Sequence, residues 1–284
     1  MKKRKGKKRR NDQIELTSER LLFSFTEGYI IFVDDSTYIM YPSKSRRNKK
    51  LINGDAINCI ELGVCSLEDK KLRFEILSPN LPNELDSISI FDKSIQSEDT
   101  FNRGIISNGL VENQTADHVS FNKVIFKNVI FNNVLFKYLD LVDVRFENCD
   151  LSNMDLSESV LHKVEMVNCK MVGTNMSESA LRNVLFDNCN GSYALFRFLD
   201  CKQVNFNNSA LCNADFYKAK LLKVGFNESN LQQTGMSGAK LKGIDLSSCK
   251  IDGLGVAVDD LSGCIVSPEQ VISFSNLLGL IIKR

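Results

Sequence analysis

Residues 141–166 read LVDVRFENCDLSNMDLSESVLHKVEM, and a large apolar residue occupies every fifth position of this stretch. The same phase continues without an insertion from Phe121 to Leu261. Of the 29 positions spaced five residues apart, 27 are Phe, Leu, Met, Ile or Val, and the exceptions are Gly191 and Cys201. Such regularity in a chain that is 43% hydrophobic indicates an internal repeat. The secondary structure therefore has to be assigned from the period of this repeat.

A period of five matches neither the 3.6 residues of a helical turn nor the two-residue alternation of a strand. The position two residues before each large residue is mostly small or β-branched, as in Val144, Cys149 and Val164. The other three positions are rich in Asn, Asp, Ser, Lys and Glu. The pattern predicts a chain that turns a corner every five residues and points one large and one small side chain inward on each side.

A second period, four times as long, lies over the first. Successive segments of this length end in Val or Ile, at Val164, Val184, Val204, Val224 and Ile244. Four sides of five residues make one coil, so the sequence predicts a square solenoid of about seven coils spaced by about 4.8 Å. Three cysteines recur at this spacing and are expected to pack as an inner ladder of small residues rather than to bind metal: Cys149, Cys169 and Cys189.

The motif Ala/Val-x-Phe/Leu-x-x, as in Ala214-Asp215-Phe216 and Ala239-Lys240-Leu241, resembles the pentapeptide-repeat family. The resemblance implies an all-β fold, a right-handed quadrilateral β-helix. By itself it says little about function, because repeat folds serve many partners.

Two further stretches are similar to the Qnr proteins, in particular to the loop-less chromosomal Qnr type of Gram-positive cocci. One is SYALFRF at residues 192–198, and the other is DLSGCIVSPEQ at 260–270 followed by LLGLII at 277–282. The likeness runs from about residue 72 to residue 284. It implies a protein that is not an enzyme, binds no cofactor or small-molecule substrate, and protects DNA gyrase, with topoisomerase IV as a further partner, from quinolone drugs.

The C-terminal residues predict a helix that caps the solenoid. Ser267 suits the N-cap, Pro268 suits the first helical position, and Gln270 completes the spacing of a capping box. The resemblance adds a second role, a symmetric homodimer formed through this helix. The residues predicted to form the apolar face and the dimer contact are Val271, Phe274, Leu277 and Leu278.

Charge divides the chain into unlike parts although its total is only +1. Residues 1–50 carry a net charge of +8, residues 51–117 carry −7, and residues 118–284 are balanced. We expect a basic N-terminal extension at 1–71, a lead segment and N-terminal cap at 72–117, the β-helix at 118–266, and the C-terminal helix and tail at 267–284.

The extension at residues 1–71 has no counterpart in the Qnr resemblance and leaves three interpretations. Its apolar runs Tyr29–Val33 and Thr37–Tyr41 favour a small β-rich unit. Its first ten residues, MKKRKGKKRR, form a like-charge run that attracts nucleic acid or anionic lipid, so it can be a basic domain that touches DNA. Alternatively, translation begins near Leu72.

The Qnr resemblance also implies a negative, duplex-like surface on the rod. Residues 140–200 have a net charge of only −5, whereas duplex DNA carries about one charge per 1.7 Å, so charge mimicry is partial and confined to the first half of the rod. Tyr193 and Phe198 occupy outward positions beside Gly191 and are either aromatic contact residues or local packing around the glycine. The acidic candidates for topoisomerase contact, each of which can instead be an ordinary solvated residue, are Asp140, Asp143, Glu147, Asp150, Asp155, Glu158, Glu165 and Glu178.

Several classes of protein are disfavoured. The sequence contains no catalytic constellation, no CxxC pair and no apolar run long enough to span a bilayer, and its start lacks a signal-peptide cleavage site. Scattered cysteines favour a reducing cytoplasm. The alternatives to topoisomerase protection from quinolones are an interaction scaffold, a self-protection protein against another topoisomerase toxin, or a nucleic-acid-binding protein that works through residues 1–10.

Overall fold

The computed structural model describes residues 22–24, 29–33, 38–42, 74–91, 94–278 and 281. The basic run at residues 1–10 and most of the expected N-terminal extension therefore lie outside the described residues.

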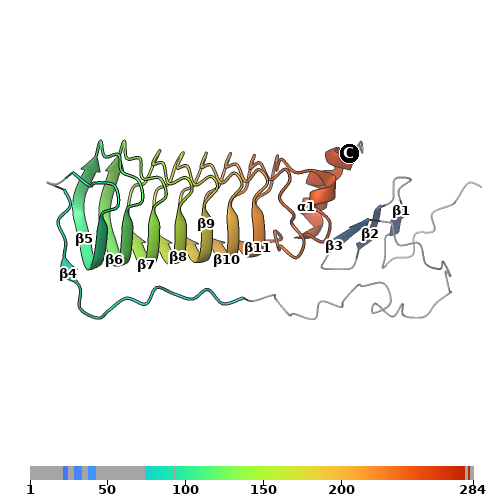
Figure 1. Cartoon of the computed structure of the whole chain (residues 1–284). Coiled ribbons are helices and arrows are strands. Elements are labelled where there is room, and N and C mark those ends of the chain that lie inside the picture. The colour runs from blue at the N-terminus through green and yellow to red at the C-terminus, as the bar shows by residue number, and fades with distance from the viewer. Residues whose placement is uncertain are drawn as a thin grey trace, which may run out of the picture.

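Parallel strands stack into a β-solenoid of about seven turns, which confirms the predicted fold class (Figure 1). The strands pair in the order β11-β10-β9-β8-β7-β6-β5-β4, and from β5 to β11 each residue pairs with its equivalent one coil later, as Phe186 does with Phe206. The strands are β4 (Asp86–Ser87), β5 (Thr100–Glu112), β6 (Ser120–Asn132), β7 (Asp140–Glu147), β8 (Val160–Val167), β9 (Ala180–Asp187), β10 (Asp200–Asn207) and β11 (Lys220–Asn227).

Each coil has four sides, which we name by their inward residue in the coil that begins at β7. The first side is centred on Leu141, the second on Phe146, the third on Leu151 and the fourth on Leu156, and every twentieth position repeats the side. The strands form the first and second sides, and β5 and β6 extend onto the third; elsewhere turns and isolated bridges form the other two sides. Neighbouring coils are joined by backbone hydrogen bonds, such as Leu151 N to Lys170 O at 2.7 Å.

The corners explain why the polar positions favour asparagine. Every corner residue from Asn108 to Asn168 adopts a positive φ, between 52° and 60°. This left-handed conformation is accessible to Asn at lower cost than to most other residues with a Cβ. Corner asparagines in successive coils also hydrogen-bond to one another, as Asn188 Nδ2 does to Asn168 Oδ1 at 2.8 Å. The repeat therefore encodes both the turn and part of its stabilisation.

The core consists of inward side chains stacked between coils. Phe206 is 1% exposed, and its ring stacks on Phe186 at 4.6 Å and on Phe226 at 5.2 Å between ring centroids. It also makes edge contacts with Phe196 and Phe216, which lie on the fourth side of two successive coils. A side chain in this position is buried only when both neighbouring coils are present.

The sheet begins earlier than residue 118, the start of the β-helix that the repeat pattern predicts. β5 pairs with β6 over most of its length and supplies a coil in which two inward positions are Gly104 and Gly109. A Cβ at either glycine would collide with Ile88 or with the ring of Phe91. These two side chains from the preceding segment pack against the core at the open end of the solenoid. Because the end coil needs room for them, it departs from the repeat and escapes the sequence pattern.

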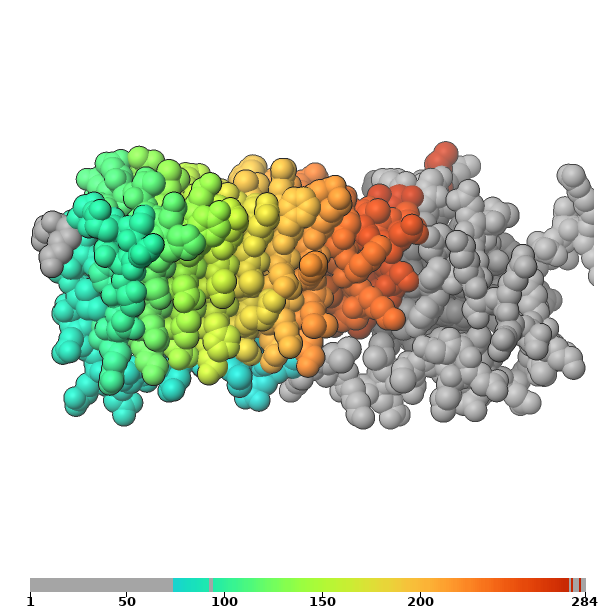
Figure 2. All heavy atoms as spheres, viewed as in Figure 1, coloured from blue at the N-terminus to red at the C-terminus, as the bar shows by residue number. Residues whose placement is uncertain are grey.

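Within the part at 72–117 that is expected to hold a lead segment and cap, residues 74–85 run along the rod before the chain enters the first coil (Figures 1 and 2). From here on, the name lead segment refers to residues 74–85 alone. Gln203 Nε2 donates to Glu75 O at 3.1 Å, Leu77 N donates to Asn183 Oδ1 at 3.3 Å, and Asn80 N donates to an oxygen of Asp143 at 2.9 Å. The acceptor and donor side chains all lie on the corner between the first and second sides. The lead segment therefore covers this corner from β10 to β7.

The predicted C-terminal helix is present. After the 3₁₀ turn η1 (Val258–Asp260) and strand β12 (Ile265–Val266), helix α1 spans Pro268–Phe274 and continues as the 3₁₀ helix η2 (Ser275–Leu278). The capping box forms, with Ser267 N donating to Gln270 Oε1 at 2.8 Å. Gln270 Nε2 also donates to the carbonyls of Leu246 and Cys249, both at 2.8 Å. One side chain thus caps the helix and fixes it to the last coils.

Three N-terminal strands are also described: β1 (Leu22–Ser24), β2 (Tyr29–Val33) and β3 (Tyr38–Pro42). They pair antiparallel in sequence order, and β3 pairs with β12. The apolar run at residues 29–33 is therefore a strand, as the sequence predicts. In the described part of the chain, no helix is long and apolar enough to cross a membrane.

Truncation of a stacked phenylalanine tests the dependence of each coil on its neighbours. We expect Phe206→Ala to lower the free energy of unfolding by about 3–5 kcal/mol, because it leaves a cavity between two stacked rings. Urea unfolding monitored by circular dichroism measures the loss. The exposed Lys250→Ala serves as the control and should change stability by less than about 0.5 kcal/mol. A similar small effect for both variants would contradict this account of the core.

Candidate partner-binding surface

The solenoid distributes the predicted acidic residues around the rod instead of gathering them on one side. Asp140 lies on the first side, Glu147 and Glu165 on the second, Asp150 on the third and Asp155 on the fourth. Sequence order alone conceals this, because residues five apart lie on different sides and only residues one full coil apart share one. The acids therefore do not form a single duplex-like negative face.

Asp143 is covered by its own chain. It is only 8% exposed, because the lead segment lies over it and the Asn80 amide donates to its carboxylate. A covered carboxylate offers little negative surface to a partner, so Asp143 acts in this structure as an anchor for the lead segment. The contact joins residues 63 positions apart and leaves no signal in the repeat pattern.

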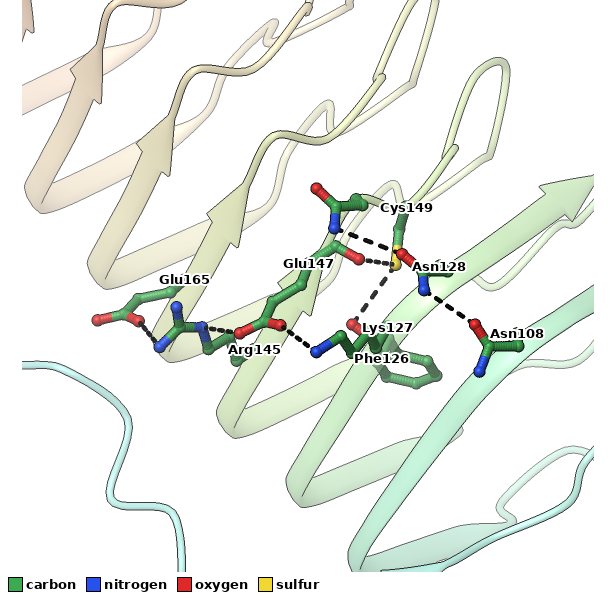
Figure 3. Close-up of polar contacts among 9 residues, drawn as sticks. Asn108, Phe126, Lys127, Asn128, Arg145, Glu147, Cys149 and Glu165 are labelled. Atoms are coloured by element: carbon green, nitrogen blue, oxygen red, sulfur yellow. Dashed lines mark hydrogen bonds and ion pairs between the residues drawn. The ribbon is translucent and has the colours of Figure 1, made fainter.

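Basic residues offset the acids of the second side. Arg145 lies between Glu147, at 2.8 Å, and Glu165, at 3.5 Å, and Lys127 approaches Glu147 at 3.6 Å (Figure 3). The four side chains come from three neighbouring coils and form one chain of alternating charge. The local field of the two glutamates is therefore largely balanced on this side.

The acids of the third and fourth sides also have local partners. Asp150 pairs with Lys170 at 3.1 Å, and its other oxygen accepts from the Ser152 amide at 3.0 Å. Although partial burial opposes the effect, these contacts hold the pKa of Asp150 below its ordinary value. Asp155 accepts hydrogen bonds from Asn175 and from the Ser157 amide. Both carboxylates stabilise the turns of the solenoid.

The remaining acids share one edge of the rod with two aromatic residues. Tyr138, Glu158, Glu178 and Phe198 follow one another at intervals of one coil, occupy the corner between the fourth and first sides, and all have positive φ. We call this row the aromatic–acidic ridge. All four are exposed, and the ring of Tyr138 stacks on His118 at 4.8 Å. A hydrogen bond to the Glu158 carboxylate raises the pKa of Tyr138, and the negative charge of Glu158 adds to the shift.

Tyr193 and Phe198 do not fill the gap at Gly191. They are 60% and 47% exposed, respectively, and the atom nearest to a Cβ built on Gly191 belongs to Leu211 of the next coil. The two aromatic residues lie on different corners, so only Phe198 belongs to the ridge. It meets Tyr217 edge-on, with ring centroids 5.6 Å apart.

A shallow hollow of about 300 Å³ lies beside this aromatic pair on the fourth side. Its walls include Arg197, whose Nε is 2.6 Å from the Asp215 carboxylate. The lining residues are Arg197, Asp215, Tyr217, Gly235 and Ser237. The small residues at the base leave the ring of Tyr217 partly exposed, which extends the aromatic surface from the ridge onto the fourth side.

Tyr138 and Tyr217 are not among the contact residues predicted from the sequence. Tyr138 precedes Glu158 by one full coil, so the longer period places it on the same edge. Tyr217 follows the inward Phe216 and so falls on an outward position. Both could have been found by sorting the outward residues by side before searching for a site.

The residues predicted to form the dimer contact differ in their exposure, because the helix turns some of them toward the core and others toward solvent. Phe274 is 3% exposed and joins the core of its own chain, and Val271 is half-buried against that core. Leu277 is exposed, while the side chain of Leu278 lies outside the described residues. Ile272, which is not among the residues predicted from the sequence, is 61% exposed on the outer side of the cap.

The cysteine ladder is present as predicted. Cys149, Cys169 and Cys189 are buried, and their thiols contact one another in sequence along the rod. Outside the ladder, burial raises the pKa of the Cys249 thiol to about 11 and that of the Cys264 thiol to about 12. Within the described residues, no group of three or more His, Cys, Asp or Glu side chains is arranged to hold a metal ion.

Comparison with protein families agrees with this architecture. Residues 139–216 match the family described as "Pentapeptide repeat region", and residues 213–247 match "Pentapeptide repeats (8 copies)". Both matches lie within the solenoid and agree with its five-residue repeat. No curated protein matches the sequence.

Solved structures with similar folds include two with different described roles. One is HetL from the cyanobacterium Nostoc sp. strain PCC 7120, a pentapeptide-repeat protein involved in heterocyst differentiation, with 14% identity, a TM-score of 0.38, and coverage of 60% of this chain and 88% of HetL. Another is a trypsin-treated variant of QnrB1, a plasmid-mediated fluoroquinolone resistance protein, with 19% identity, a TM-score of 0.39, and coverage of 68% of this chain and 96% of that one. Neither likeness identifies a partner, since repeat folds serve many roles.

The anchoring role of Asp143 can be tested by hydrogen exchange. We expect Asp143→Ala to accelerate exchange of the Asn80 amide about tenfold or more, because this amide loses a hydrogen bond to a charged acceptor. Amide exchange followed by NMR or mass spectrometry measures the change. Asp140→Ala removes a nearby exposed acid and should leave Asn80 unaffected. Equal exchange in the wild type and in Asp143→Ala would show that the contact does not hold the lead segment.

Proposed function

We propose that this protein binds a type II topoisomerase, DNA gyrase or topoisomerase IV, and protects it from quinolones as a non-enzymatic binding partner. The observation that carries the proposal is the aromatic–acidic ridge, where Glu158 and Glu178 lie between Tyr138 and Phe198. The resemblance of residues 192–198 and 260–282 to the Qnr proteins supplies the identity of the partner.

The chemistry of the ridge suits a protein that normally holds DNA. A surface that binds duplex DNA must carry basic groups to neutralise phosphates, and such groups attract carboxylates in the same way. The aromatic residues beside the acids add an apolar contact area that a DNA phosphate backbone does not offer. Tyr is also frequent among the interface residues that contribute most of the binding energy. The ridge therefore combines partial charge mimicry with a protein-like anchor.

The regularity of the rod decides how contact is made. From β6 to β11 the coil register has no insertion, so no loop projects from this part of the solenoid. Binding through the ridge then places rigid side chains against the partner with little ordering cost. The corner covered by the lead segment is the least available part of the surface.

Charge reversal on the ridge tests the proposal in a gyrase supercoiling assay with ciprofloxacin. We expect the wild type to restore supercoiling, and Glu158→Lys combined with Glu178→Lys to raise the protein concentration needed by about tenfold or more. Like charges brought together at an interface cost several kcal/mol, which accounts for the loss.

Glu228→Lys combined with Asp252→Lys is the matched control, because these exposed acids lie away from the ridge and give the same change in net charge. It should protect gyrase as well as the wild type does. Absence of protection by the wild type over a wide concentration range would refute the topoisomerase proposal and favour an interaction scaffold. Equal loss in both variants would show that net charge, not the ridge, determines binding.

Dimerisation through the C-terminal cap is part of the same proposal. Since Phe274 faces its own core, the contact would use the outer side of the cap, where Ile272 and Leu277 are exposed. We expect Ile272→Asp combined with Leu277→Asp to convert a dimer to a monomer in sedimentation velocity. Leu222→Asp, a change at a 57% exposed residue on the rod, should leave the dimer intact. A wild-type monomer at micromolar concentration would contradict the proposal.

A further inference from the structure

The second half of the rod concentrates its positive charge on one side. Residues 201–266 contain seven lysines and no arginine, and only Lys250 lies on another side of the coil. The remaining six occupy the first side and the two corners that border it, and we call them the lysine face. They are Lys202, Lys218, Lys220, Lys223, Lys240 and Lys242.

All six side chains are exposed, and few acids offset them. Within residues 74–91 and 94–278, the ion pairs of the structure include only Lys240 of this set, which meets Asp260 at 2.8 Å. Asp200 also lies on the first side, but it is paired with Arg182 at 2.6 Å. The lysine face thus has a clear excess of positive charge although the balance of residues 201–266 is nearly neutral.

The strands hold the face in a fixed arrangement. In the parallel register, Lys202 of β10 lies opposite Leu222 of β11, and Lys220 lies opposite Asp200. Lys240 and Lys242 follow one coil later. At about 4.8 Å per coil, the three coils place the charges within about 10 Å along the rod axis. The corner residues Lys218 and Lys223 border the face on either side.

We propose that the lysine face binds the phosphate backbone of duplex DNA. Lysine is depleted from the cores of protein–protein interfaces, because burying its strongly hydrated ammonium group is costly. Phosphate contacts need no such burial, and they are the main sequence-independent source of affinity for DNA. Leu222 is the one strongly exposed large apolar residue of this face, so the set of exposed lysines fits a polyanion better than a protein partner.

The surroundings favour a duplex over a single strand. Single-strand binding needs aromatic faces on which bases stack. The nearest aromatic residues, Phe198 and Tyr217, are packed edge-on against each other, and Lys218 Nζ lies 5.1 Å from the centroid of the Tyr217 ring. These rings lie at the margin of the face, and no aromatic residue lies among its six lysines. The face also lacks the Arg, Asn and Gln groups that read base edges bidentately, apart from Gln203 under the lead segment, so binding should be independent of sequence.

This inference does not rest on the proposed function. The lysine face belongs to the second half of the rod, while the acids of the ridge belong to the first half. A rod with these two surfaces can contact a protein partner through the ridge and DNA through the lysine face. Both contacts can form together when the protein partner is itself bound to DNA.

The test measures binding of the full-length protein to a fluorescent duplex of about 20 base pairs and mixed sequence across a salt series. We expect the combination Lys202→Gln, Lys220→Gln and Lys242→Gln to lower the magnitude of the slope of log affinity against log salt by about 2.7. This value corresponds to three lost phosphate contacts at about 0.9 each. The wild-type protein should bind the duplex more tightly than a single strand of the same length.

The matched control is Lys127→Gln, Lys137→Gln and Lys250→Gln, which removes three exposed lysines from the other three sides. It should keep the wild-type slope, and circular dichroism should confirm that both triple variants are folded. An unchanged slope in the first triple variant would overturn the proposal and assign any DNA binding to other parts of the chain. Equal losses in both variants, or preference for the single strand, would also overturn it. No gyrase is present, so failure here leaves the topoisomerase proposal standing.

Discussion

Every other feature of this protein depends on the contact between an inward side chain and its equivalent one coil away. A single coil cannot bury its own phenylalanines and leucines, because each ring needs a neighbour above and below. Stacks such as Phe186, Phe206 and Phe226 supply that burial and align the backbones for hydrogen bonding. The fold is therefore cooperative along its length and quasi-one-dimensional.

The same stacking turns the sequence into parallel rows on the surface. Residues one coil apart in sequence become neighbours at about 4.8 Å, while residues five apart are directed to different sides. A run of acids along the chain is thereby dispersed, and lysines that look evenly spread become one face. The charge of a segment consequently says little about the field of any one side, and the aromatic–acidic ridge and the lysine face exist only in this folded arrangement.

The first and last coils of the rod have a neighbouring coil on one side only, so other segments must cover their exposed core. At the start, Ile88 and Phe91 enter the space left by Gly104 and Gly109. At the finish, Gln270 joins the capping helix to carbonyls of the last coils, and Phe274 closes the core. These contacts depart from the repeat since their purpose is to end it.

Local spacing was enough to predict the repeat, the four-sided coil and the cysteine ladder, because stacking between coils enforces each of them. The capping helix was predicted from its own local signals, the capping box of Ser267 and Gln270 and the proline at the first helical position. Other features emerged only from the folded chain: the lead segment covers Asp143, and Phe274 faces inward. The lead segment covers Asp143 through the hydrogen bond from the Asn80 amide, and these two residues are 63 positions apart in sequence. No periodicity in the sequence encodes such a contact. Periodic positions fix which residues point outward, but the path of non-repeating segments over the rod decides which of them remain exposed.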